Sequence, residues 1–265
     1  MRIRPLLSLL SGCLLVTATA EAQFKQPEIV PGENYRVEAS LMFWQPTPEI
    51  TLSTDALQGH DVDFVKELTI ENERFNDFRS AFKVGHTHRL RVNFMKIQYE
   101  KDTFIQRTFV YNNRTYNIGL PVNAGLTWDL WRFGHEWDFF VRNRGFIGLM
   151  TDVKFNKIDV GLATPVAGAV ARQVKFPLPT TGVIARGYPG KYVSATAEFT
   201  YFKLPDFSDK YQAKYHDFDI YALVSIGEHL GVQGGFRTFK LDYFIDEDSG
   251  RLKMTGPYFG GVARF

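Results

Sequence analysis

The feature that most constrains the fold of this sequence is a two-residue alternation of apolar and polar side chains. From Tyr35 to Leu41 and from Val193 to Tyr201, every second residue is apolar and the residues between are polar or small. A helix repeats every 3.6 residues, whereas strand side chains alternate between two faces. The chain is therefore predicted to be all-β, with further strands of this kind at Val122–Leu130, Ile147–Phe155 and Phe218–Ile226.

The N-terminus has the pattern of an export signal. Arg2 and Arg4 precede the apolar stretch Leu6–Val16, and Ala20-Glu21-Ala22 forms a small-x-small cleavage motif. The apolar stretch is shorter than the roughly 20 residues that a spanning helix needs. A cleaved signal peptide is the resulting prediction.

This signal divides the chain into two parts. We expect residues 1–22 to be the signal peptide, with cleavage between Ala22 and Gln23. Residues 23–265 then form one mature domain. Cleavage after Ala20 is the near alternative.

Cys13 is the only cysteine of the chain. It leaves open a lipidated N-terminus, although the apolar stretch before it is short. The expected mature chain then has no cysteine, which excludes disulfides and cysteine ligands. The formal net charge of +2 argues against a nucleic-acid-binding protein, whose surface would be strongly basic.

The C-terminus distinguishes a membrane barrel from a soluble sheet, which could show the same alternation. The chain ends on Phe265, and Phe259, Gly261 and Ala263 share its strand face. A final amphipathic strand that closes on Phe resembles the assembly signal of bacterial outer-membrane proteins. The resemblance implies that the barrel assembly machinery is a partner, through Phe265. We therefore expect a closed antiparallel transmembrane β-barrel.

The alternation and the turn residues predict about ten strands, with about eight as the alternative. Short periplasmic turns are expected at 85–88, 188–190 and 227–229, with a longer one at 133–144 that fits less well. A small hairpin is expected at 111–116. The strands are expected to begin near Tyr35, Asn76, Arg89, Val122, Gly145, Pro177, Lys191, Lys214, Leu230 and Arg251, and long extracellular loops at 46–75, 101–121, 159–176 and 204–213.

Two turn-plus-strand segments carry a family resemblance. Tyr188–Glu198 and Gly227–Arg237 look like units of small outer-membrane barrels of the OmpA-like and OmpW-like group. The resemblance implies a Gram-negative cell envelope, an outer-membrane location and contact with outer-membrane lipid and lipopolysaccharide. Many such barrels have no known activity, and no peptidoglycan-binding domain is evident in this sequence.

The polar strand faces predict charges in the barrel lumen. Both signs occur in similar numbers, which suggests paired charges that fill a narrow interior, because unpaired buried charge is costly. A wide porin is not expected. The candidate lumen charges are Arg36, Glu38, Arg91, Asp129, Asp152, Lys154, Glu198, Asp217, Asp219 and Arg237.

The tryptophans and histidines have structural explanations. Trp44, Trp131 and Trp137 are expected at the membrane interfaces. His216 with Asp217 or Asp219 is the one candidate catalytic constellation, but Asp217 points to the opposite strand face from His216. No catalytic residue, metal site or cofactor is therefore predicted, and the chain is not expected to be an enzyme.

The expected function is a structural, surface-interaction or passive-transport role, with an unknown extracellular partner. A narrow channel for small or apolar solutes is the main alternative. A lipid-modifying enzyme and a soluble lipocalin-like carrier are less favoured.

Overall fold

The computed structural model describes residues 34–54, 62–67, 72–105, 108–111, 114–164, 168–204, 211–245 and 248–265. The predicted signal peptide and its cleavage between Ala22 and Gln23 lie outside these ranges. Within them, no helix is long and apolar enough to cross a membrane. One short helical turn, α1 (Phe64–Glu67), follows the two-residue strand β3 (Val62–Asp63).

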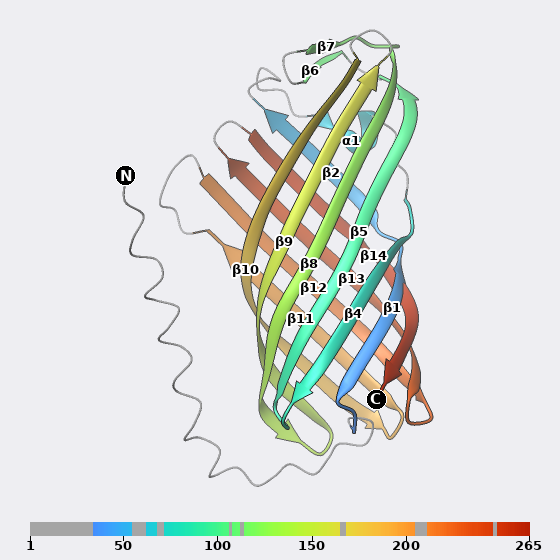
Figure 1. The fold of residues 1–265 in the computed structure, drawn as a ribbon, viewed down its shortest axis with the longest axis vertical. Coiled ribbons are helices and arrows are strands. Elements are labelled where there is room, and N and C mark those ends of the chain that lie inside the picture. The colour runs from blue at the N-terminus through green and yellow to red at the C-terminus, as the bar shows by residue number, and fades with distance from the viewer. Residues whose placement is uncertain are drawn as a thin grey trace.

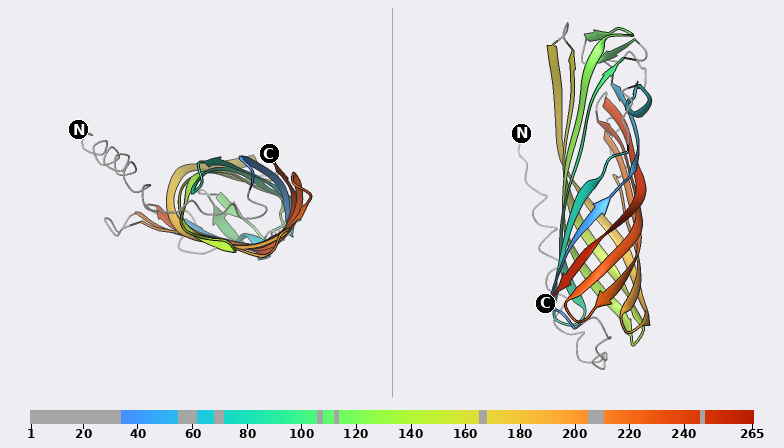
Figure 2. Two further views of the ribbon diagram at one scale, coloured as in Figure 1. Left: turned by 90° about the horizontal axis from the view of Figure 1, so that it is seen from below. Right: turned by 90° about the vertical axis from the view of Figure 1, so that its right-hand side faces the viewer.

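Ten strands form a closed antiparallel barrel (Figure 1). Each strand pairs with its neighbours in the ring, and the ring closes where the first strand pairs with the last. The closed ring is visible end-on in Figure 2, left. The predicted fold class and the count of ten are confirmed. In ring order the strands are β1 (Val37–Trp44), β4 (Phe75–Val84), β5 (His88–Phe104), β8 (Pro121–Arg142), β9 (Gly145–Thr164), β10 (Gly168–Gly190), β11 (Val193–Lys203), β12 (Tyr211–Ile226), β13 (Leu230–Ile245) and β14 (Asp248–Arg264).

The two ends of the barrel differ. Tight turns close one end, which also holds Phe265, and we call it the turn end; the opposite end is the loop end. Gly85 and Gly227 occupy two of the tight turns with φ of 81° and 74°, a backbone conformation that glycine adopts without steric cost. The predicted turns at these two positions are therefore correct.

Four short elements lie at the loop end. β2 (Thr47–Thr54) continues beyond β1 and pairs with β14, and β3 pairs with β2. The predicted hairpin is present as β6 (Phe109–Tyr111) and β7 (Arg114–Tyr116).

Two predicted connections are wrong. Residues 133–144 are not a turn, because β8 continues to Arg142 through an irregularity in its pairing between Trp137 and Phe140. This irregularity breaks the two-residue period and hides the strand. Residues 159–176 are not a loop either, because they belong mostly to β9 and β10, paired up to Thr164 and Gly168.

The outward face of the barrel changes from apolar to polar partway along the strands. On β9, the outward residues Leu149 and Phe155 are exposed apolar side chains, whereas Lys157 and Asp159 follow on the same face. Toward the turn end the outside is therefore apolar, as lipid requires. Toward the loop end it is polar, as water requires.

The segment Val122–Leu130 shows this reversal most clearly. We expected its apolar residues to face lipid, but Leu126 and Trp128 are 2% and 0% exposed inside the barrel. Thr127 and Asp129 point outward instead. The expectation was wrong because a two-residue period is the same whether lipid or water lies outside.

A belt of charged residues marks the edge of the apolar band. Paired positions on neighbouring strands place Lys96 beside Asp129, Asp129 beside Lys157, and Lys157 beside Lys175. On the other wall, Lys240 of β13 pairs in register with Lys253 of β14. We call these residues the charged belt: Lys96, Asp129, Lys157, Lys175, Lys240 and Lys253.

Beyond the belt the barrel opens into two facing sheets, which we call the extension (Figure 2, right). β10 pairs with β11 only between Thr181 and Gly190, and β4 begins only at Phe75. Above these points one sheet consists of β5, β8, β9 and β10, and the other of β2, β12, β13 and β14.

An apolar core fills the space between the two sheets. Phe239 of β13 contacts Trp128 of β8 at 5.1 Å and Trp44 of β1 at 5.5 Å between ring centroids. Trp44 is 1% exposed, so the expectation that it lies at a membrane interface was wrong. Trp131 and Trp137 do point outward and are exposed.

Candidate functional site

The barrel interior below the apolar core is filled by a cluster of charges, which we call the charge network. Eight of the ten strands contribute side chains to it, and every member is buried or nearly so. Among the described residues, seven cations face seven carboxylates. They are Arg79, Arg89, Arg91, Arg132, Lys154, Arg186 and Arg237, with Asp77, Glu136, Asp138, Asp152, Glu198, Asp217 and Asp219.

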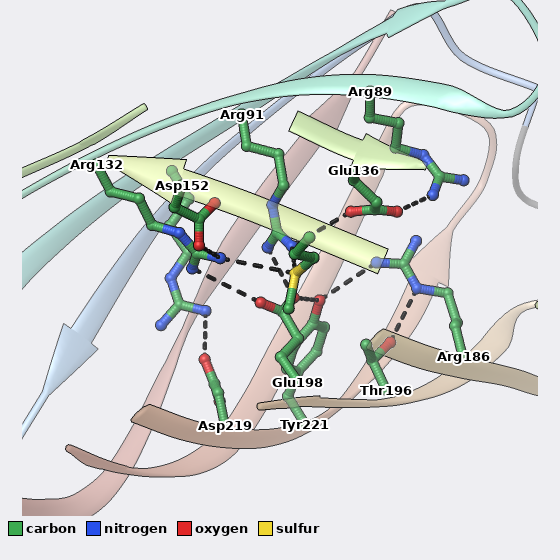
Figure 3. Close-up of polar contacts among 12 residues, drawn as sticks. Arg89, Arg91, Arg132, Glu136, Asp152, Arg186, Thr196, Glu198, Asp219 and Tyr221 are labelled. Carbon is green, nitrogen blue, oxygen red and sulfur yellow. Dashed lines mark hydrogen bonds and ion pairs between the residues drawn. The ribbon is translucent and has the colours of Figure 1, made fainter. Parts of the chain in front are cut away.

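Glu136 and Glu198 anchor the half of the network nearer the turn end (Figure 3). Arg91 donates to Glu198 Oε1 at 2.7 Å and to Glu136 Oε2 at 3.2 Å. Arg89 is paired with Glu136 and with Asp138, the latter at 2.7 Å. Two carboxylates on β8 and one on β11 are thus joined to β5 by arginines.

Arg132 and Asp152 form a further pair, with Nη2 and Oδ2 2.8 Å apart. Gly134 lies beside them on β8. A Cβ at this position would overlap the Asp152 carboxylate, so glycine leaves the space in which that carboxylate meets Arg132.

Asp217 is the most connected carboxylate of the other half. Arg237 donates to its two oxygens at 3.0 and 2.8 Å, and Lys154 Nζ lies 3.3 Å from Oδ2. Arg237 also reaches Asp77 at 3.3 Å. Such two-pronged arginine–carboxylate pairs are geometrically specific and strong.

Arg79 completes the network on the β4 wall. It donates to Asp77 and to Asp219, each at 2.8 Å. The Tyr258 hydroxyl donates to Asp219 at 2.7 Å. Across the barrel, Arg186 donates to Thr196 Oγ1 at 2.9 Å, and the Tyr221 hydroxyl donates to Glu198 at 2.9 Å.

The arrangement leaves little free space along the barrel axis. A cavity lined by Arg79, Arg132, Asp217 and Arg237 measures about 10 Å³, which is room for about one water molecule. Burying this many charges is costly unless each finds partners, and here charges of both signs occur in equal numbers. The network therefore acts as a plug that ties the strands together across the barrel.

The structure brings most of the predicted lumen charges together. Arg91, Asp152, Lys154, Glu198, Asp217, Asp219 and Arg237 belong to the network, and Glu38 pairs with Arg264 at 2.6 Å near the turn end. Two placements differ from the prediction. Asp129 lies on the outward face, 3.7 Å from Lys157, because the apolar face of its strand segment is turned inward. Arg36 precedes β1 and is exposed.

Sequence reasoning missed several members of the network. Glu136 and Asp138 lie in the segment 133–144 that the sequence predicts as a turn, and Arg89 lies at a predicted strand start. Asp77, Arg132 and Arg186 are also buried on the inward faces of their strands, but they were not among the predicted lumen charges. Extending the alternation from Arg132 by four residues would have found Glu136, because Glu136 lies before the irregularity.

No group of three or more His, Cys, Asp or Glu side chains suited to a metal ion occurs in the part of the chain that the structure describes. His88 and His135 lie 3.0 Å apart on the outward face near the turn end. His216 is half-buried on the outward face, while Asp217 points inward, so the two do not form a pair.

A closed ring of ten antiparallel strands, an apolar outer band and a charged interior define a β-barrel of the outer-membrane type. No protein-family model and no curated protein matches the sequence. Solved structures do match the fold. The outer membrane protease OmpT of Escherichia coli has a TM-score of 0.57 and 8% identity, over 87% of this chain and 97% of that one.

Two further solved structures are similar over most of the chain. The attachment invasion locus protein Ail of Yersinia pestis has a TM-score of 0.39 and 10% identity, over 87% of this chain and 99% of that one. The toluene transporter TodX of P. putida has a TM-score of 0.38 and 8% identity, over 89% and 92%. Of these matches, the one to OmpT supports a shared fold and no more, and the grouping with OmpA-like and OmpW-like barrels stays a prediction.

Proposed function

We propose that this protein is a closed outer-membrane anchor that carries a rigid extension for interactions at the cell surface. The observation that carries the proposal is the filling of the interior. The charge network occupies the membrane-spanning part, and the apolar core lies directly above it. A solute would have to displace both to pass through.

The outer membrane is the proposed location. Tight turns are typical of the periplasmic end of such barrels and longer loops of the extracellular end. With the turn end in the periplasm, the extension stands on the cell surface. Strands β5, β8, β9 and β10 then carry hairpin β6–β7 farthest from the membrane (Figure 1).

Lipopolysaccharide and the barrel assembly machinery are the proposed envelope partners. Lys96, Lys157 and Lys175 lie directly beyond the apolar band, at the level where the phosphates of an anionic outer leaflet are expected. Phe265 is exposed at the turn end, where its backbone N–H donates to the Val37 carbonyl at 2.8 Å. The Phe265 side chain therefore stays accessible to the assembly machinery, while its backbone is paired with β1.

Conductance of the refolded protein in planar lipid bilayers tests the closed interior. We expect no discrete current steps, because buried charges fill the barrel interior and the cavity beside Arg79 and Asp217 has room for only about one water molecule. A water-filled porin in the same bilayer serves as the positive control. Regular ion-selective steps from this protein would contradict the proposal and favour the narrow channel.

The surface role requires its own measurement. Cells that display the whole chain are compared, in adhesion and autoaggregation, with cells whose chain has residues 108–118 replaced by a short Gly-Ser linker. The proposal expects weaker adhesion with the linker at equal surface amounts. Unchanged adhesion would remove hairpin β6–β7 from the interaction surface.

A further inference from the structure

A groove crosses the outer surface of the barrel within the apolar band, near the turn end. It has a volume of about 570 Å³, which lies in the roughly 300–1,000 Å³ range of small-ligand sites. β9, β10, β11 and β12 form its floor, and the end of β8 forms one wall. The charge network lies on the inner side of the same strands, and Arg186 is the one network member that also lines the groove.

Small outward side chains make this surface concave. Ala185 of β10 pairs in register with Ala197 of β11, and Gly187 pairs with Ala195 two positions nearer the turn end. Their neighbours on either side are large: Ile147 pairs with Ala185, and Ile220 pairs with Ala197. The result is a trough of small residues between two apolar ridges. Most of its exposed lining is apolar.

Two arginines stand at the end of the groove nearest the turn end. Arg142 ends β8 and Arg144 lies in the turn that follows, and both line the groove and are exposed. The Arg142 guanidinium lies 5.2 Å from the ring centre of Phe140, another lining residue. Within the described ranges, neither arginine is ion-paired with a carboxylate. Two cations at the membrane edge of an apolar trough complement a molecule with an anionic head and an apolar tail.

We propose that this groove binds an anionic glycerophospholipid of the leaflet at the turn end. One acyl chain lies along Ala185 and Ala197, and the head-group phosphate is held by Arg142 and Arg144. Arginine suits this role because its planar donors match phosphate oxygens. Positive clusters at a membrane surface attract anionic lipids, and this attraction falls off within a Debye length, about 8–10 Å at physiological ionic strength. The proposal rests on the membrane barrel and is independent of whether the lumen conducts.

Native mass spectrometry of the full chain in detergent tests the site. The protein is incubated with equal amounts of dioleoyl phosphatidylglycerol and dioleoyl phosphatidylcholine, which share acyl chains and differ in head-group charge. We expect preferential retention of phosphatidylglycerol. Arg142→Gln or Arg144→Gln should lower that preference roughly fivefold, and the double variant about 30-fold.

A further variant distinguishes the contribution of the apolar groove to lipid binding from that of the two arginines. Ala197→Leu fills the trough while keeping an apolar outward residue, so retention of both lipids should fall with the barrel intact. Two matched controls lie on the opposite wall of the ring, one directly before β1 and one on it. Arg36→Gln removes an exposed cation at the same end, and Ala39→Leu adds the same volume to an outward position. Both should behave as the unchanged protein.

Three results would overturn the proposal. The first is equal retention of the two lipids by the unchanged protein. The second is a head-group preference that survives the double arginine variant or is lost equally with Arg36→Gln. The third is a dimer of the chain that disappears with Ala197→Leu, because the groove would then be a contact between two copies.

Discussion

Replacing Arg237 with alanine is expected to destabilise the folded barrel by about 3–5 kcal/mol, the usual cost of removing one partner from a buried ion pair. Arg237 holds Asp217 through two hydrogen bonds and Asp77 through a third, and its side chain is 5% exposed. Its loss leaves these two carboxylates with fewer partners inside the barrel. Urea-induced unfolding in lipid vesicles, followed by tryptophan fluorescence, measures the change in free energy.

Arg251→Ala is the matched control. Arg251 also pairs with a carboxylate, Asp242 at 2.9 Å, but its side chain is 66% exposed on the extension. An exposed pair contributes about 0–1 kcal/mol. Arg237→Met distinguishes the charge from the volume, because it keeps most of the apolar stem and should still be strongly destabilised. Equal losses for Arg237→Ala and Arg251→Ala would show that the network does not stabilise the barrel.

Replacing Trp128 with alanine is expected to cost about 3–5 kcal/mol, as is usual for a large buried aromatic residue. Trp128 is 0% exposed, packs edge-on against Phe239, and donates its indole N–H to Asn156 Oδ1 at 3.1 Å. The substitution opens a cavity between the two sheets of the extension. The same unfolding measurement applies.

Trp131→Ala on the same strand is the control for Trp128→Ala. Trp131 points outward, is 43% exposed and packs on Phe94 at 4.5 Å. Its loss should cost clearly less, because lipid or detergent replaces the ring on the outside. A larger effect at Trp131 than at Trp128 would mean that the assignment of inside and outside along β8 is reversed.

The strand positions could largely be predicted from the sequence. The expected starts at Asn76, Arg89, Val122 and Leu230 lie within one residue of the observed ones. Local features determine these positions: turn glycines at the ends and a period of two between them. The predicted loop at 159–176 was too long. The alternation of β9 and β10 continues into it, but the outward side chains change there from apolar to polar.

The direction in which each face points could not be predicted from the period alone. Val122–Leu130 has the same alternation as Val193–Tyr201, yet the apolar face of the first is inside and that of the second is outside. The difference depends on whether a strand segment lies in lipid or in water. A strand that continues past the membrane shows this transition only where its outward side chains change from apolar to charged. On β9 the change lies between Phe155 and Lys157.

The pairing of the interior charges was also beyond sequence reasoning. Arg91 and Glu198 are 107 positions apart, and Arg237 and Asp77 are 160 apart. Alternation places each side chain inside the barrel but does not say which carboxylate it meets. That depends on the stagger of ten strands around the ring.

Single-cysteine labelling along β9 tests the central claim most directly, namely that this strand leaves lipid for water between Phe155 and Lys157. Cysteines are placed one at a time at the outward positions 149, 153, 155, 157 and 159, in a chain whose Cys13 is replaced by serine, and vesicles are treated with a membrane-impermeant maleimide. We predict fast labelling at 157 and 159 and protection at 149, 153 and 155. Uniform labelling at all five positions, or protection at 157 and 159, would contradict the account.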